Sequence, residues 1–515
     1  MADILSWATF RRILVPALWT IAVVTMTRLL WPDPAALPWH LRIPAIAVYG
    51  AILLGCYHLC CERLDALGMW PSLAAIVIIA LGLRAAWFGA VKNEQVSDFA
   101  IYQELAASLA SGKGYAITGP VGVEDMEFSI GKGHSLPYTT AFRPPGAPLW
   151  GALLYKVFGP NPKVFLVSNI IFGAGTAALI FLLFELQGAR LGRRAALAWS
   201  VYPSSVMATN LYGTEALSVF SLMLIAWTLT ACPDRARAKM PLVGLLAAAA
   251  ALIRSLLVPL IVSISAAIWM GAGMKRGMSR VAVFLAFAAL GLMPWTVRNW
   301  SVFHRVIPVC TLEGMFLGQH TALNVPPDGQ DAPWQEASYR RWRETSDEAE
   351  RSARGYGIAA DNLRRMLLGG PLHASLCLFF NVWSVFSDDQ DILLWSIRRS
   401  FMSSRRSGPE FVMEGPSYQR WRCLLTAFHL LVVLGALAGA LRLGTTRESH
   451  PPGLAFLAVF FLMTFAAHAL TRGTHRYQFL VQPFMLILAA RGYDGIRERR
   501  GLIRDAVRRL RPSWG

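Results

Sequence analysis

Residues 163–185 read KVFLVSNIIFGAGTAALIFLLFE, and they indicate the fold class of the 515-residue chain. No charged residue stands between Lys163 and Glu185. Its length matches the roughly 20 apolar residues that an α-helix needs to cross a bilayer. The apolar residues run continuously and do not alternate, which favours a helix over a strand of a membrane barrel. The sequence therefore predicts a membrane-spanning helix.

The whole chain repeats this pattern, because 55% of its residues are hydrophobic and only 16% are charged. Soluble domains contain about a quarter charged residues. We predict an all-α, polytopic transmembrane helix bundle of about twelve spans, with two long external loops that carry interfacial helices. The predicted spans are 14–31, 43–61, 70–90, 163–185, 194–210, 213–231, 241–256, 257–272, 280–297, 422–441, 453–470 and 475–491.

The net charge of +18 does not indicate nucleic-acid binding, because most of the excess Arg and Lys lies in short segments between apolar runs. That distribution follows the positive-inside rule and places both termini in the cytoplasm. The tail at 492–515 alternates Arg with Ile, Val and Leu at helical spacing, which predicts a basic amphipathic helix on the membrane surface. We expect membrane lipids, and no nucleic acid, among the partners.

The predicted spans divide the chain into five parts. Residues 372–387 are apolar but short, and we interpret them as a re-entrant or interfacial segment. The parts are an N-terminal transmembrane hairpin at 1–66, a membrane core at 67–297 that includes a first external loop at 91–162, a second external region at 298–421, C-terminal transmembrane helices at 422–491 and the tail at 492–515.

Asp98 stands just after the third predicted span, at or near the start of a short helix on the membrane surface. One interpretation is structural, since a carboxylate there caps the helix and complements its dipole. The other is catalytic, since a carboxylate at the edge of an apolar cavity can take a proton from an acceptor hydroxyl. The two roles can coexist.

Arg143 directly precedes Pro144, Pro145 and Gly146, which set a sharp entry into an apolar helix. One interpretation is that Arg143 lies near the membrane surface and only extends its charged group into the interface. Its place beside a rigid turn, in the same loop as Asp98, argues instead for a fixed cation that binds a phosphate or a carboxylate.

Several short motifs, in order, resemble one known superfamily. Residues 98–102 (DFAIY), 109–115 (LASGKGY) and 143–149 (RPPGAPL) look like the first external loop of the C-type glycosyltransferases, which include the dolichyl-phosphate-mannose protein mannosyltransferases and their bacterial relatives. Similar motifs follow at 214–215, 252–254, 294–299 and 475–477. The resemblance covers roughly residues 70 to 495, and the ordered set is more specific than any single motif.

The resemblance implies a hexosyl- or pentosyltransferase of the bacterial inner (plasma) membrane. It moves a sugar, with inversion, from a polyprenyl-phosphate-linked donor to an acceptor hydroxyl of a glycan, lipid or protein at the periplasmic face. Asp98 matches the family's general base. Cationic side chains hold the leaving phosphate, and those expected here are Arg143, Arg298, Arg476 and Arg254. The expected supporting residues are Glu94, Tyr102, Glu215 and His475.

Two departures from the family pattern matter. Some relatives carry two adjacent acidic residues where this chain has Ser97 and Asp98, so a second carboxylate must come from elsewhere in the chain, and Glu94 and Glu215 are candidates. Several relatives carry Lys where Arg143 stands, which keeps the charge but changes the hydrogen-bond geometry.

No cofactor is expected. The histidines show no paired spacing for zinc, and Glu124, Asp125 and Glu127 fit a solvated acidic loop better than a divalent-ion site. Two alternatives stay open: a transporter or flippase for a lipid-linked saccharide, and an oligosaccharide ligase of the same superfamily. Transporters place charged groups near the bilayer midplane, whereas the candidate charges here collect at one face.

Overall fold

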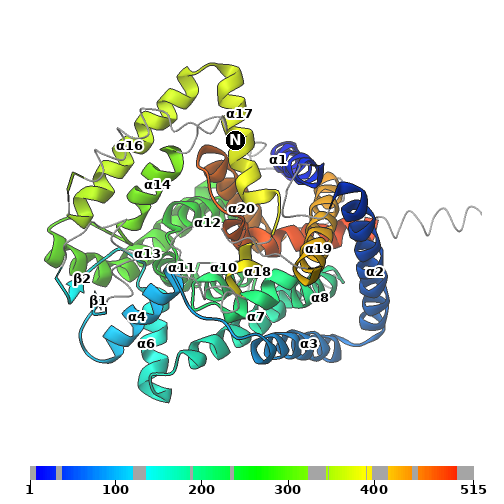
Figure 1. Ribbon diagram of the computed structural model, residues 1–515, viewed down its shortest axis with the longest axis horizontal. Helices are drawn as coiled ribbons and strands as arrows, with labels where there is room; N and C mark the ends of the chain where they lie inside the picture. The colour runs from blue at the N-terminus through cyan, green and yellow to red at the C-terminus, as the bar shows by residue number, and fades with distance from the viewer. Residues whose placement is uncertain are drawn as a thin grey trace, which may run out of the picture.

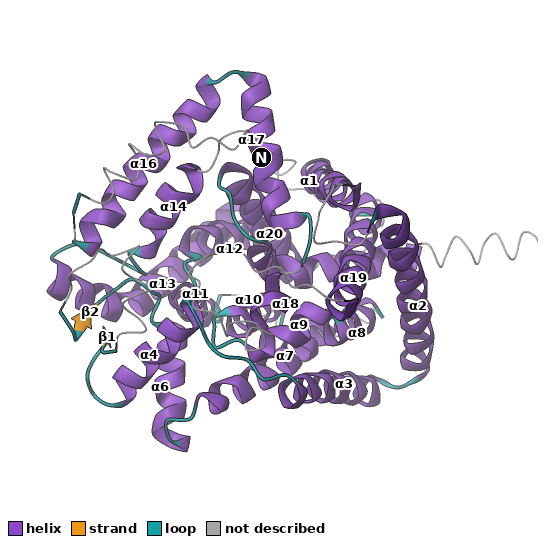
Figure 2. Ribbon diagram, viewed as in Figure 1, coloured by secondary structure: helices purple, strands orange, loops and turns teal. Residues whose placement is uncertain are grey.

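The computed structural model describes residues 7–30, 38–119, 135–185, 190–231, 237–322, 344–345, 347–389, 391–396, 416–443 and 451–495. Within these ranges the chain is almost entirely helical, and the only strands are the short pair β1 and β2 (Figures 1 and 2). The pair is antiparallel, with Ala116 opposite Thr139 and Ile117 opposite Tyr138. The predicted all-α class is therefore confirmed.

The elements follow in chain order. They are α1 (Trp7–Leu30), α2 (Trp39–Ala66), α3 (Met69–Ala90), α4 (Asp98–Ala110), β1 (Ala116–Ile117), β2 (Tyr138–Thr139), α6 (Gly146–Phe158), α7 (Pro162–Glu185), α8 (Leu191–Val201), α9 (Pro203–Met207), η2 (Ala208–Asn210), α10 (Glu215–Thr230), α11 (Met240–Ile253), α12 (Leu257–Ala272), α13 (Met274–Phe303), α14 (Leu312–Ala322), α16 (Glu348–Leu368), α17 (Pro371–Phe386), α18 (Asp391–Ser396), α19 (Pro416–Leu441), α20 (Pro452–Leu470) and η5 (His475–Val481).

Seven described helices are long and apolar enough to cross a membrane: α1, α2, α3, α7, α13, α19 and α20. The chain is a multi-pass membrane protein. Shorter apolar helices are α10, α11, α12 and α17. At 1.5 Å per residue, α11 is only about 21 Å long and α12 about 24 Å, less than the thickness of a hydrocarbon core. The count of twelve spans stays a prediction.

The predicted span at 194–210 is wrong as a continuous helix. Helix α8 ends at Val201, Pro203 starts the five-residue helix α9, and a 3-10 turn closes the segment. Proline cannot supply the N–H that would continue α8, so the chain restarts at Pro203. The last predicted span, 475–491, also begins differently, because η5 is a 3-10 helix and the α-helix starts only at residue 482.

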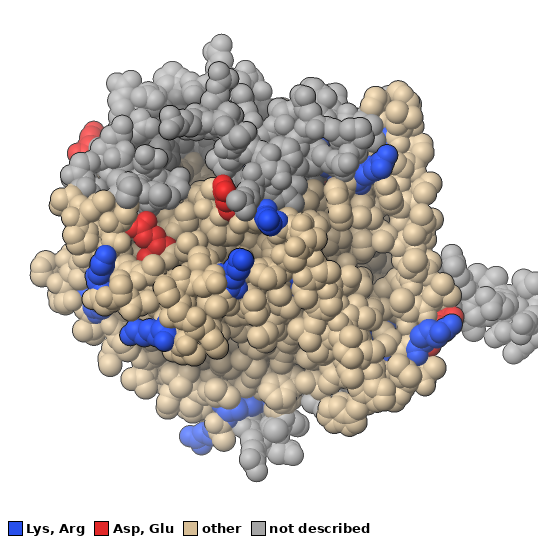
Figure 3. All heavy atoms as spheres, turned by 60° about the horizontal axis from the view of Figure 1, so that its bottom comes forward, with Lys and Arg blue, Asp and Glu red and all other residues tan. Residues whose placement is uncertain are grey.

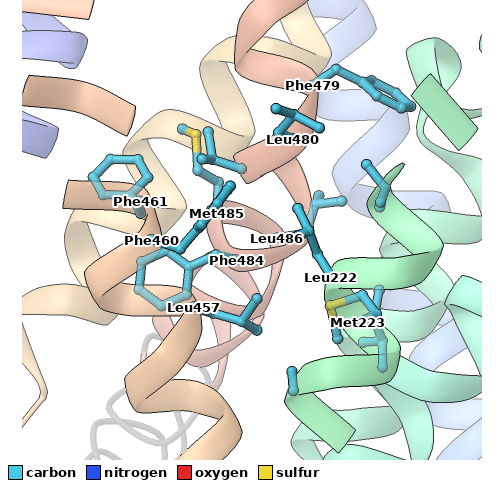
Figure 4. Packing of buried hydrophobic residues seen from close by; sticks show 14 of the residues in the cluster. Leu222, Met223, Leu457, Phe460, Phe461, Phe479, Leu480, Phe484, Met485 and Leu486 are labelled. Atoms are coloured by element: carbon cyan, nitrogen blue, oxygen red, sulfur yellow. The ribbon is translucent and has the colours of Figure 1, made fainter. Parts of the chain in front are cut away.

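Figure 4 shows the part of the hydrophobic core where α10, α20 and residues 479–490 meet. Phe461 of α20 packs against Phe484 with 5.6 Å between ring centroids, and Leu222 and Met223 of α10 close the other side. Charged side chains are sparse among the coloured residues on the face in Figure 3.

The two regions that are predicted to be external share one hydrophobic core. Ile101 and Leu105 of α4, Phe142, Met315 of α14 and Ile358 of α16 are buried against one another. Helices α14 and α16 cross at Gly314 and Gly355, where a methyl group on either residue would collide with the other helix. Described residues of 91–162 and 298–421, which the sequence analysis treats as separate regions, therefore pack together.

Candidate active site

Asp98 is the first residue of α4, and its carboxylate is bound by two arginines. Arg143 donates from Nη2 to Oδ1, and Arg476 donates from Nη2 to Oδ2 at 2.7 Å. The preceding residue, Ser97, has φ 53°, a backbone conformation that is uncommon for a residue other than glycine. No hydrogen bond from the Ser97 side chain caps α4. Both oxygens of Asp98 thus face cations.

A second carboxylate, Glu215, completes the cluster from the start of α10. Its Oε1 lies 3.4 Å from Nη1 of Arg254 and 3.5 Å from Nε of Arg476. Arg254 also donates to Thr214 Oγ1 at 3.1 Å. Of the two carboxylates that the sequence left open as partners of Asp98, Glu215 lies in this cluster. Glu94 is exposed, four residues before Asp98.

The local turns bring these side chains together. Arg254 stands in extended conformation between α11 and α12 and so separates the two helices. The turn before α6 packs directly on this break, because a Cβ on Gly146 would lie 2.8 Å from the backbone nitrogen of Ile253. Only glycine allows this approach, so residues 143–146 place Arg143 beside the end of α11.

Aromatic rings surround the arginines. The guanidinium of Arg476 lies 5.2 Å from the ring of Phe99 and 5.6 Å from that of Trp395, while Arg143 lies 5.8 Å from the ring of Tyr102. Such contacts stabilise a cation away from bulk water. Burial raises the pKa of Tyr102 to about 12, so its hydroxyl stays neutral.

Charge is unbalanced within this cluster, since three arginines face two carboxylates. Asp98 is its most exposed member, with 24% of its side chain accessible against 3% for Glu215. Burial alone would raise the pKa of Asp98, but Arg143 and Arg476 outweigh it and hold that pKa well below its usual range. The cluster therefore combines an accessible, ionised carboxylate with one positive charge in excess, an arrangement that suits an anion.

Two predicted residues have other partners. Arg298 donates to the backbone oxygens of Thr140 at 2.8 Å and Tyr115 at 3.3 Å, so its described hydrogen bonds hold the chain near β1 and β2. His475 lies beside Asp98's partner Arg476, and its Nε2 is 3.2 Å from Ser387 Oγ.

Asp391 is a site residue that the sequence analysis missed. Its Oδ2 accepts from the backbone N–H of Arg476 at 3.2 Å, and its Oδ1 lies 3.9 Å from Nδ1 of His475. It therefore fixes the segment that carries Arg476. The signal in the sequence was the acidic run Asp388, Asp389 and Asp391 immediately after the apolar segment 372–387.

Among the described residues, no three His, Cys, Asp or Glu side chains lie close enough together to hold a metal ion. Glu124, Asp125 and Glu127 lie outside the described residues.

No family model and no curated protein matches this chain. Matching solved structures include the oligosaccharyltransferase AglB from Archaeoglobus fulgidus in complex with an inhibitory peptide and a dolichol-phosphate, at 15% identity over 87% of this chain and 52% of that chain, with a TM-score of 0.48. They also include ArnT from Cupriavidus metallidurans bound to undecaprenyl phosphate, at 14% identity over 85% of this chain and 81% of that chain, with a TM-score of 0.36.

Both neighbours are C-type glycosyltransferases. This chain spans about half the length of AglB. The roles of individual residues therefore rest on the geometry of this chain.

Proposed function

We propose that this protein is a membrane glycosyltransferase that moves a single hexosyl or pentosyl unit from a polyprenyl-phosphate-linked donor to an acceptor hydroxyl at the external face of a bacterial inner membrane. The observation that carries the proposal is the cluster of Asp98 with Arg143, Arg254 and Arg476, which offers a carboxylate and excess positive charge at one place. The motifs that resemble the C-type glycosyltransferases fall on the same residues.

In the proposed reaction the acceptor oxygen bonds to the anomeric carbon while the bond from that carbon to the phosphate oxygen breaks. The acceptor proton passes to Asp98, and the bonding electrons leave with the lipid phosphate. Attack from the face opposite the phosphate inverts the anomeric centre. Arginines placed where negative charge develops lower the barrier, because a preorganised cation needs no reorganisation during the step.

The ion pairs of Asp98 have a consequence for this reaction. A carboxylate with a strongly lowered pKa is a weak base, and both oxygens of Asp98 are occupied by arginines. A lipid phosphate that binds Arg143 and Arg476 competes for these same guanidinium groups. Donor binding thereby weakens the two ion pairs and makes Asp98 more basic at the moment when the acceptor must lose its proton.

The test is sugar transfer from a panel of polyprenyl-phosphate sugars by the purified protein in nanodiscs, with Asp98→Asn compared at equal folded yield. We expect transfer by the wild type and a loss of about 10²- to 10⁴-fold in the variant, the range that a general base contributes. Donor binding should persist in the variant. If neither protein transfers sugar while both move lipid-linked saccharide across liposomes, the chain is a transporter and the proposal is wrong.

A further inference from the structure

Glu348 is a buried carboxylate outside the cluster around Asp98. It is the first residue of α16, is 1% exposed, and accepts four hydrogen bonds. The hydrogen-bond donors are Tyr138 Oη at 3.2 Å, Thr140 Oγ1 at 2.7 Å, the backbone N–H of Ala141 at 2.9 Å and Thr311 Oγ1 at 2.6 Å. All four are neutral groups. A buried carboxylate is costly unless such bonds satisfy it, so this one holds its surroundings in a fixed geometry.

Three of these four groups belong to the segment that leads to Arg143. Thr140 Oγ1 donates to Glu348 and accepts from the backbone N–H of Phe142 at 2.9 Å. The guanidinium of Arg143 then lies 4.7 Å from the ring of Phe142, and Tyr115 Oη donates to the backbone oxygen of Arg143 at 2.8 Å. A continuous series of contacts therefore connects Glu348 with Arg143.

The second external region also holds this segment from other directions. Arg298 donates to the backbone oxygen of Thr140, and the backbone N–H of Thr311 donates to the backbone oxygen of Ala141 at 3.0 Å. Ala141 also packs in one apolar cluster with Ala349, the residue after Glu348. Burial raises the pKa of Glu348, in spite of its four hydrogen bonds. Most of the hydrogen bonds described between the two regions therefore fall on residues 138–141.

We infer that Glu348 is a positioning residue for the donor phosphate: through Thr140 and Ala141, it docks the second external region on the first and holds Arg143 in place. This inference rests on the proposed function. It makes the affinity for a lipid phosphate depend on a residue that does not itself contact the phosphate. Small displacements of a positioned group are costly, so losing this carboxylate matters even though Arg143 remains.

The experiment measures the binding of undecaprenyl phosphate to the full chain in nanodiscs, as a double-mutant cycle of Glu348→Ala with Arg143→Ala. We expect Glu348→Ala to weaken binding by about tenfold. In the Arg143→Ala background the same change should cause no further loss, because Glu348 acts through Arg143. Glu348→Gln should bind within about threefold of wild type, since its amide oxygen still accepts from Ala141 and the hydroxyls can turn to accept from its amino group.

The matched control is Glu350→Ala, which removes the same charge two residues along α16. Glu350 pairs with Arg354 and Thr345 and does not contact the first external loop in the described structure. We expect its binding to equal that of the wild type. If Glu348→Ala is not recovered folded, Thr140→Val replaces it in the cycle, because that change removes the connecting hydroxyl and leaves the carboxylate in place.

Two results overturn the inference, and they differ in what else they affect. If Arg143→Ala weakens binding but Glu348→Ala does not, or if the two losses add, Glu348 does not act through Arg143 and the proposed function stands. If Arg143→Ala itself binds undecaprenyl phosphate as the wild type does, the phosphate site is wrong, and the proposed function falls with the inference.

Discussion

Arg84 and Arg143 are both among the buried arginines of this chain, at 0% and 9% exposure. Arg84, in the middle of α3, donates to the backbone oxygens of Ala80 at 3.1 Å and Ser200 at 3.3 Å and to Ser205 Oγ at 2.9 Å. Arg143 instead donates to the carboxylate of Asp98.

The comparison shows two uses of the same side chain. Arg84 satisfies the carbonyl group of Ser200 at the end of the broken helix α8, and Gly173 of α7 leaves space for its side chain. Arg143 shares an accessible anion with Arg476. A guanidinium bound to neutral carbonyls cannot leave without exposing them, whereas one bound to a carboxylate can exchange it for a phosphate.

The largest effect that we expect is the loss of catalysis when an arginine that binds Asp98 is removed. Arg143→Ala and Arg476→Ala should each lower kcat/KM for the lipid-phosphate donor by about 10²-fold, the effect of removing one group that stabilises transition-state charge. Steady-state transfer assays at equal folded yield measure it. Arg472→Ala, an exposed arginine four residues before Arg476, is the control. Rates within threefold of wild type in the two test variants would remove these arginines from the site.

Arg84→Met should have the opposite profile. It keeps most of the volume of the side chain but removes the hydrogen bonds to Ser200 and Ser205, and we expect a loss of about 2 to 4 kcal/mol of stability. The melting temperature in nanodiscs reports it, with Arg276→Met, which changes an exposed arginine, as the control. Transfer per folded molecule should stay within threefold of wild type. A stable but inactive Arg84→Met protein would show that the contrast between the two arginines is wrong.

The smallest effect concerns pH. Because the arginines lower the pKa of Asp98, its carboxylate stays ionised through mildly acidic pH, and wild-type kcat/KM should show no loss there from this group. Without Arg143 the raising effect of burial is opposed by one cation fewer. The pKa of Asp98 then rises. As the pH is lowered, the variant should therefore lose activity at a pH at least about one unit above that at which the wild type does, equivalent to about 1.4 kcal/mol. A pH–rate profile of Arg143→Ala that matches the wild type would contradict the ion-pair account.

Much of the site was predictable because its residues stand at helix ends with recognisable neighbours. Asp98 begins a surface helix, Arg143 precedes two prolines, and Arg254 interrupts an apolar run. The sequence could not show which of these charged side chains meet in the fold. A charged side chain at the interface looks the same whether it binds a carboxylate or, as Arg298 does, backbone oxygens.

The break in the span predicted at 194–210 and the role of Glu348 were hidden for a similar reason. Apolar residues continue on both sides of Pro203, so composition alone predicts one continuous helix over 194–210. Glu348 belongs to a segment of mixed charge that predicts a solvated helix, yet it is buried because the first external region covers it. Both features depend on tertiary partners far away in the sequence.

The ion pair between Asp98 and Arg476 joins residues 378 positions apart. Chains grow at roughly 5 to 20 residues per second, so about 20 to 75 s separate the synthesis of the two partners. During that interval Asp98 has only its nearer cation, and the part of the external core that comes from α14 and α16 arrives late. The cluster around Asp98 is therefore among the last features to form during biogenesis. A chain that stalls before residue 476 inserts most of its helices and yet lacks a complete site.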